Sequence, residues 1–209
     1  IFNSAGSVEF EKRKSDLTRL INVQGMKNLL GFATQFGIGH IHQMSTLYVA
    51  GKKQGDIFES DLFEGPPENF NNAYEWTKAE AENLILKWSK ETNSYFSIYR
   101  LPIVIGDSKD GKTLSFTGFY GFFKPFWTLK TNIRERIHQD PRLNEAGVSV
   151  DNGFVIAPLF VKCSNSSKID LVPIDWVVRS IRLASEKSES RNIIIHLSHP
   201  FAPSSREVI

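Results

Sequence analysis

Hydrophobic residues recur along the first half of the chain with helical and strand spacing in alternation. The pattern predicts, in order, a strand end at Ile1–Asn3, a helix from about Ser15 to Phe36, a strand at Ile38–Thr46, a loop at Lys52–Asn72, a helix from Ala73 to about Thr92, and a strand at Tyr95–Ile105. Parallel neighbouring strands need crossover connections, so this alternation favours an α/β fold with helices on the faces of a parallel sheet.

The alternation of helical and strand spacing ends after Asp107. The stretch from Phe116 to Trp127 is rich in aromatic residues and forms either the core of a small lobe, the wall of an apolar acyl channel or a dimer contact. Periodicity returns with a helix from Val172 to about Ser185 and a strand at Asn192–Leu197. We therefore divide the chain into a main domain (1–108), a small substrate lobe (109–172) and a segment that returns to the main sheet (173–209).

Composition narrows the functional classes. The 209 residues include 25 Lys and Arg and 23 Asp and Glu, a net charge of +2 without a basic run, which argues against a nucleic-acid-binding surface. No apolar run reaches the roughly 18 residues that cross a bilayer, so we expect no membrane span. The single cysteine, Cys163, excludes an internal disulfide and suits a reducing, cytoplasmic compartment. The five histidines form no ligand set, so we expect no metal.

A tyrosine followed four residues later by a lysine occurs three times, as Tyr48/Lys52, Tyr74/Lys78 and Tyr120/Lys124. Residues four apart share a face only on a helix, and only the second pair opens a predicted helix. A tyrosine has a pKa of about 10, which a nearby ammonium can lower by roughly 1 to 3 units. The phenol could then act as general acid or base on a carbonyl. The alternative is an accidental pair on a solvated helix face.

Two further positions support this chemistry. Ser45 and Thr46 close a buried strand, and ligands of open α/β sheets bind at the carboxyl ends of strands. A hydroxyl there could hold a substrate oxygen beside the phenol. Asn22 lies within a predicted helix, where it is either a proton relay through water or a polar residue on an exposed face.

Five segments, in order, give the chain a recognisable resemblance. They are Asn22-Val23-Gln24-Gly25 through Leu30, Ser45-Thr46-Leu47-Tyr48-Val49-Ala50-Gly51, Asn72-Ala73-Tyr74 through Glu82, Tyr99-Arg100-Leu101-Pro102-Ile103-Val104-Ile105-Gly106-Asp107 and Leu171-Val172-Pro173-Ile174-Asp175. Together they resemble the extended short-chain dehydrogenase/reductase family, most closely its thioester reductase and fatty acyl-CoA reductase (male sterility) group.

The resemblance implies the C-terminal part of a Rossmann-type doubly wound sheet that binds NADP, with NAD as the alternative. It implies Tyr74 as acid/base, Lys78 as the residue that binds the nicotinamide ribose and lowers the tyrosine pKa, and Thr46, with Ser45 as alternate, as the carbonyl-orienting hydroxyl. Asn22 matches the family's helix asparagine. Pro102, Ile103 and Val104 are expected to line the nicotinamide pocket, and Ala5 and Gly6 to pass close to the adenosine side of the cofactor.

The implied activity is reduction of a carbonyl, including an acyl thioester to an aldehyde, on a small or carrier-bound substrate. The alternatives are a nucleotide-sugar epimerase or dehydratase of the same family, and a non-catalytic dinucleotide-binding regulator. The glycine-rich turn that holds the pyrophosphate is missing from this sequence. We therefore expect an excerpt of a longer protein with neighbouring domains, and weak dinucleotide binding by the isolated chain.

Overall fold

The computed structural model describes residues 1–114, 118–158 and 168–208. Phe116, where the aromatic stretch begins, and Cys163 lie outside the described residues. The chain forms two compact units, one of residues 1–111 and 170–202 and the other of residues 112–169 and 203–209.

A four-stranded parallel sheet is the centre of the first unit. Its strand order is β1-β2-β3-β8, with β1 at Phe2–Asn3, β2 at His40–Thr46, β3 at Tyr95–Leu101 and β8 at Ile193–His196. The strands are parallel throughout, and Thr46 at the end of β2 stands opposite Leu101 at the end of β3. The α/β class predicted from the sequence is therefore confirmed.

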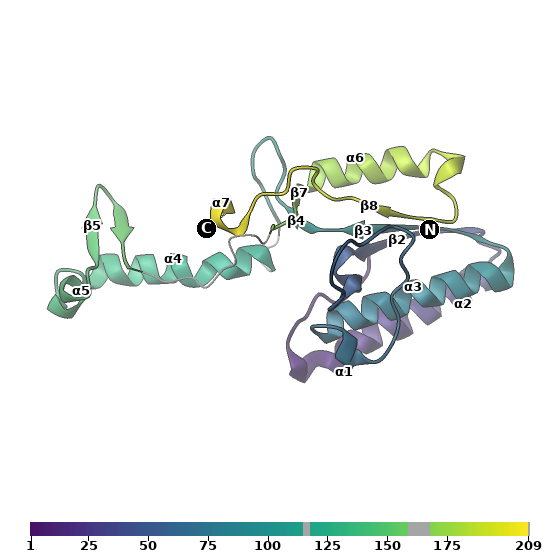
Figure 1. Ribbon diagram of the computed structural model, residues 1–209, viewed down its shortest axis with the longest axis horizontal. Helices are drawn as coiled ribbons and strands as arrows, with labels where there is room; N and C mark the ends of the chain where they lie inside the picture. Colours follow the sequence, from purple (N-terminus) through teal and green to yellow (C-terminus); the bar gives the residue numbers. More distant parts are fainter. Residues whose placement is uncertain (115–117, 159–167, 209) are drawn as a thin grey trace. The chain divides into compact units, whose positions relative to one another are not determined.

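Helices cover both faces of this sheet (Figure 1). One face carries α1 (Ser15–Arg19), the π-helical turn η2 (Leu20–Gln24), α2 (Gly25–Gln35) and α3 (Ala73–Thr92), and the other carries α6 (Ile174–Ser185). The helix expected over residues 15–36 forms, but a π turn interrupts it. Apolar spacing does not predict that interruption, and π turns are frequent at functional sites.

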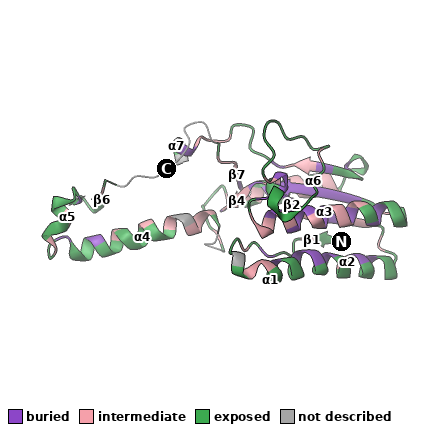
Figure 2. Cartoon of the chain, turned by 60° about the horizontal axis from the view of Figure 1, so that its bottom comes forward, coloured by how far each residue is buried: buried purple, intermediate pink, exposed green. Residues whose placement is uncertain are grey.

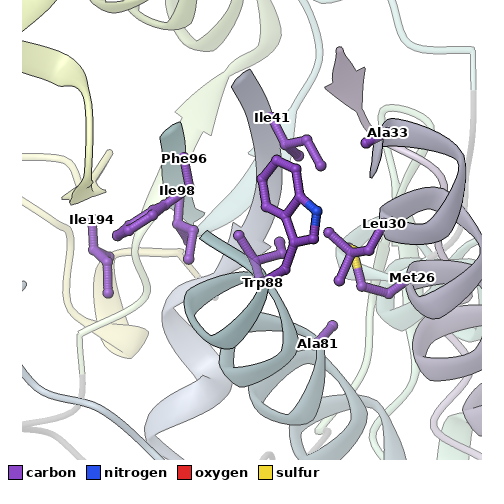
Figure 3. Close-up of a cluster of buried hydrophobic side chains, with 10 residues drawn as sticks. Met26, Leu30, Ala33, Ile41, Ala81, Trp88, Phe96, Ile98 and Ile194 are labelled. Carbon is purple, nitrogen blue, oxygen red and sulfur yellow. The ribbon is translucent and has the colours of Figure 1, made fainter. Parts of the chain in front are cut away.

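The main core lies between the sheet and the pair α2 and α3. Buried residues gather in β2, β3 and α3 (Figure 2), and Trp88 of α3 packs among apolar side chains of both layers (Figure 3). The cluster comprises Met26, Leu30, Ala33, Ile41, Ala81, Ile85, Trp88, Phe96, Ile98 and Ile194. This packing fixes α3 against the sheet, and with it the residues at the start of the helix.

Capping residues set the bounds of α3. The Asn72 side chain accepts a hydrogen bond from the Glu75 backbone N–H at 3.0 Å and donates to the Glu75 carboxylate at 3.1 Å. The first of these bonds satisfies a backbone donor that a helix start leaves unpaired, and the second holds the two side chains together. At the other end, Asn93 adopts a left-handed conformation and ends the helix.

The strand expected over Tyr95–Ile105 is wrong in its extent. It divides at Pro102 into β3 and β4 (Ile103–Ile105), and β4 pairs in parallel with β7 (Leu171–Pro173) in a separate two-stranded sheet. Proline has no N–H to donate to a ladder, so the chain leaves the main sheet at this residue. The predicted final strand does join the main sheet, as β8.

The second unit contains α4 (Phe119–Arg136), α5 (Pro141–Glu145), the antiparallel pair β5 (Ser149–Asp151) and β6 (Phe154–Ile156), and α7 (Ser205–Val208). Its buried core consists of Ile133, Ile137 and Val148. The aromatic part of α4 lines a hollow of about 720 Å³ with Lys124 and Lys130, and Trp127 is 70% exposed. The described part of this stretch is thus separate from the buried core.

Short 3-10 turns complete the chain, at Lys12–Lys14, Leu47–Ala50, Pro67–Asn69 and Ser188–Ser190. No helix within the described ranges has the length and apolar character needed to cross a bilayer.

Candidate active site

The candidate site lies at the carboxyl edge of the main sheet. Thr46 is the last residue of β2, and the chain returns through the loop of residues 52–72 to begin α3 at Ala73. Because α3 connects two parallel strands, its first turns lie at the edge where β2 ends. Tyr74 and Lys78 therefore lie in the first turns of α3, at the same sheet edge as Thr46. Open α/β sheets bind ligands at this edge.

Lys78 is a buried cation with only 7% of its surface exposed. Its ammonium donates a hydrogen bond of 2.6 Å to the Met44 backbone carbonyl, two residues before the end of β2. Burial lowers the pKa of Lys78 to about 8, and the Glu82 carboxylate one helical turn further along acts in the opposite direction. The side chain is therefore still protonated at neutral pH, with N–H groups beyond the one given to Met44.

The phenol of Tyr74 is half-buried, with the Phe10 ring edge-on at 5.5 Å between centroids. Burial raises its pKa, the Thr46 hydroxyl acts against the rise, and the Glu75 carboxylate adds to it. The expectation of a pKa lowered by Lys78 is therefore wrong in this structure. Burial penalises the phenolate more than its neighbours favour it, so the phenol is a proton donor.

The two hydroxyls at the end of β2 have different surroundings. The Thr46 hydroxyl oxygen accepts from the Tyr48 backbone N–H at 3.3 Å, and the same hydroxyl lowers the pKa of the Tyr74 phenol against the effect of burial. Ser45 donates instead to the Glu82 carboxylate at 2.5 Å. Successive strand residues point to opposite faces, which separates the two. The structure brings Thr46 to the phenol and leaves Ser45 bound to Glu82.

Asn22 lies in the π turn and is 5% exposed, so it does not occupy an exposed helix face. Its amide oxygen accepts from the Ser7 N–H at 2.7 Å, and its amide nitrogen donates to the Ser7 carbonyl at 3.1 Å and to the Thr77 hydroxyl at 3.0 Å. Asn22 thus joins the segment after β1 to the first turns of α3.

A cavity of about 300 Å³ adjoins these residues, and Ala5, Asn22, Gln43 and Lys78 are among the residues that line it. A methyl group placed on Gly6 would lie 3.3 Å from the Asn22 amide oxygen and 3.8 Å from the Lys78 nitrogen. The missing side chain keeps space open in front of both groups. Gly6 thus borders the Lys78 ammonium, whose N–H groups can bind ligand hydroxyls such as those of a ribose.

The other predicted cofactor contacts lie elsewhere at the same sheet edge. Pro102 directly follows Leu101, the register partner of Thr46, while Ile103 and Val104 belong to β4 and are half-buried. In the Tyr48/Lys52 pair, the lysine donates to the Glu68 backbone carbonyl. Within the described residues, no three His, Cys, Asp or Glu side chains gather as a metal site.

Sequence reasoning missed the charged residues behind the site. Glu82 and Arg100 are almost fully buried and form an ion pair, with 2.8 Å between the Arg100 Nη2 and the Glu82 Oε2. A signal was present in the sequence, because Glu82 stands four residues after Lys78 on the same helix face. Arg100 is likewise the only charged residue of β3.

The parallel sheet, the helices on both faces and the buried lysine at the strand ends define a Rossmann-type α/β protein. A family model described as male sterility protein, an NAD-binding family, matches residues 1–181, and the chain belongs to this family. Among curated proteins, no match is found.

Solved structures share the fold. The terminal R domain of the myxalamid PKS-NRPS biosynthetic pathway is 24% identical with a TM-score of 0.73, over 99% of this chain and 44% of that one. A thiolation-reductase di-domain from an archaeal non-ribosomal peptide synthetase is 21% identical with a TM-score of 0.68, over 99% and 39%. UDP-glucuronic acid 4-epimerase from Bacillus cereus, in complex with NAD, is 17% identical with a TM-score of 0.64, over 100% and 56%. The chain thus spans less than two thirds of each of these structures.

Proposed function

We propose that the chain carries the catalytic part of an NADPH-dependent reductase that acts on a carbonyl, with an acyl thioester bound to a carrier as its substrate class. The observation that supports this most is the buried ammonium of Lys78, which donates to the Met44 carbonyl two residues before Thr46 and lies one helical turn after the half-buried Tyr74. Family membership supports a nicotinamide cofactor. The printed names of two similar structures, a terminal R domain and a thiolation-reductase di-domain, motivate the choice of a carrier-bound thioester.

In this proposal, Lys78, Asn22 and the open space at Gly6 receive the nicotinamide ribose, and Ala5 lies nearby. The ammonium of Lys78 gives one N–H to Met44 and keeps others for ribose hydroxyls. Pro102, Ile103 and Val104 line the nicotinamide ring. When bound, the cofactor supplies the hydride that reduces the carbonyl carbon.

The side chains of the site then stabilise the negative charge that develops on the carbonyl oxygen. Thr46 accepts from the Tyr48 N–H and therefore keeps its own proton to donate to that oxygen. Tyr74, whose pKa is raised by burial, is a second donor and the proton source. With a thioester, the carbon–sulfur bond breaks and the thiol leaves with a proton. With an aldehyde, the proton remains on the oxygen and gives an alcohol.

Substitution of Tyr74 tests the mechanism in the full-length protein. Tyr74→Phe removes the proton donor and keeps the ring, so we expect kcat for NADPH-dependent thioester reduction to fall by about 10²- to 10⁴-fold with little change in thermal unfolding. Tyr120→Phe, at the pair on α4, serves as a matched control. A Tyr74→Phe enzyme that keeps kcat within about threefold of wild type would exclude Tyr74 as the acid.

Cofactor stoichiometry separates reduction from epimerisation. A reductase consumes one nicotinamide per product, whereas an epimerase returns it to its starting redox state. We therefore expect NADPH absorbance to fall in proportion to aldehyde formed from an acyl thioester. Turnover of a nucleotide sugar without net NADPH loss would replace the reductase proposal with the epimerase alternative.

A further inference from the structure

A buried charged network lies directly behind the candidate site. The Glu82 carboxylate on α3 accepts hydrogen bonds from Arg100 Nε at 3.2 Å, from Arg100 Nη2 at 2.8 Å and from the Ser45 hydroxyl at 2.5 Å. Arg100 has no exposed surface, and Glu82 is 3% exposed. Three hydrogen-bonding groups thus converge on one carboxylate in the interior of the first unit.

The network extends to the loop that connects β2 to α3. Arg100 Nη2 donates to the Asp61 backbone carbonyl at 2.8 Å, and its guanidinium lies 5.0 Å from the centre of the Phe63 ring. The Asp61 carboxylate in turn binds Lys53 at 2.6 Å. On β8, His196 lies 3.3 Å from Arg100 Nη1. One ion pair therefore holds the end of β2, the loop and β8 to helix α3.

Stability alone does not explain such a pair. Removing two charges from water costs several kcal/mol per ion, and well-packed apolar residues in place of a buried pair are often as stable or more so. The partners of this pair are not spread through the core. Ser45 precedes Thr46, Glu82 follows Lys78 by one turn, and Asp61 belongs to the loop that leads into α3.

We propose that Glu82 is a positioning residue of the site, which sets where Thr46 stands through Ser45 and keeps Lys78 charged through its own negative charge. The expected effect on turnover rests on the proposed function. The expected effect of Glu82 on the charge of Lys78 does not depend on it. Ser45, which we expected as an alternate catalytic hydroxyl, becomes in this proposal the link between Glu82 and Thr46.

The groups around Lys78 support the second part. The elements packed against it present the Met44 carbonyl from β2, Asn22 from the π turn, Gly6 from the segment after β1, and Tyr74 and Glu82 from α3. The charged group among these is Glu82, whose carboxylate is also paired with Arg100 of β3, and it raises the pKa of Lys78 against the effect of burial. Without that charge, Lys78 would lose its proton at a lower pH, and the alkaline limit of activity would move with it.

The pKa of Lys78 tests the proposal without turnover. Lysine side chains labelled with ¹³C at Cε are titrated by NMR, and the Lys78 signal is assigned by its loss in Lys78→Arg. We expect Glu82→Gln to lower that pKa by about 1 unit and Glu82→Asp, which keeps the charge, to restore most of the difference. Glu91→Gln, which breaks an exposed pair with Lys87 on the same helix, is the matched control.

Turnover tests the first part. Ser45→Ala leaves the Glu82–Arg100 pair intact and detaches the end of β2, and we expect kcat to fall about fivefold, the equivalent of one hydrogen bond, with an unchanged KM for NADPH. A Ser45→Ala enzyme with wild-type kcat, or a folded Glu82→Gln protein in which Lys78 titrates as in wild type, overturns the proposal. If Glu82→Gln does not fold, Glu82→Asp and Ser45→Ala decide it: the proposal requires slower turnover by Ser45→Ala and a Lys78 titration in Glu82→Asp close to wild type.

The outcomes also separate this inference from the proposed function. If Tyr74→Phe keeps its activity, the reductase mechanism fails, while the Lys78 titration still reports on Glu82. If Tyr74→Phe is inactive and Glu82→Gln leaves the Lys78 titration unchanged, only the role of Glu82 fails.

Discussion

Helices α3 and α6 lie on opposite faces of the same sheet, yet they bury different kinds of residue (Figure 1). Within its 20 residues, α3 buries the polar side chains Glu75, Thr77, Lys78, Glu82 and Ser89 alongside its apolar ones. The 12-residue α6 buries Val177 and keeps its ion pair, Arg182 with Glu186, at the surface. Burying polar groups costs free energy unless each is paired. The contrast indicates that α3 is built around a site, whereas α6 only covers the sheet.

The largest expected difference between the helices concerns their ion pairs. Arg100→Met leaves Glu82 buried without its cation, so we expect the free energy of unfolding in urea to fall by about 3 to 5 kcal/mol. Arg182→Met removes a solvent-exposed pair, and we expect no measurable change. Equal losses for the two variants would contradict the distinction drawn between α3 and α6.

A smaller effect concerns the pH dependence of stability. The pKa of Lys78 is lowered to about 8 in the folded chain from an ordinary 10.5, so between these values the unfolded chain holds a proton that the folded one has lost. Stability therefore rises with pH through this window, and we expect a gain of about 1 to 2 kcal/mol from pH 8 to 9.5. Lys78→Met should lack this gain. Arg179→Met, which removes an exposed charge from α6, should keep it.

The smallest effect is expected at the helix starts. Asn72 caps α3, whereas the residue before α6, Pro173, makes no side-chain cap. We expect Asn72→Ala to lower the unfolding free energy by about 1 kcal/mol. Asn28→Ala, on the exposed face of α2, provides a control with the same change in composition. A loss no greater than that of the control would show that the cap adds nothing to α3.

Much of the fold follows from hydrophobic spacing because its elements are locally consistent. Helix α3 runs over Ala73–Thr92 as predicted, since an asparagine cap and a run of good helix formers agree with its apolar positions. Pro102 was misjudged because the pattern of apolar residues continues across it, although the backbone cannot continue its ladder. The π turn at Leu20–Gln24 has no counterpart in apolar spacing.

The sequence was less informative about the candidate site. The order of segments indicated Tyr74, Lys78 and Thr46, and the structure brings Thr46 to the phenol. It did not indicate the direction of the Tyr74 pKa shift, because that depends on how deeply the helix start is buried. Nor could it separate Ser45 from Thr46, whose opposite directions depend on strand register.

The pairing of β4 with β7 has a consequence for how such chains diversify. The strand before the 112–169 segment, β4, pairs in parallel with the strand after it, β7, so the chain leaves and re-enters the first unit at neighbouring strands. An insertion between fixed, adjacent ends can change length at small cost, since each doubling of a flexible loop adds only about 0.6 kcal/mol of closure entropy. Evolution or an engineer could therefore exchange that segment as a cassette and leave the hydrogen-bonded frame that carries Thr46, Tyr74 and Lys78 untouched.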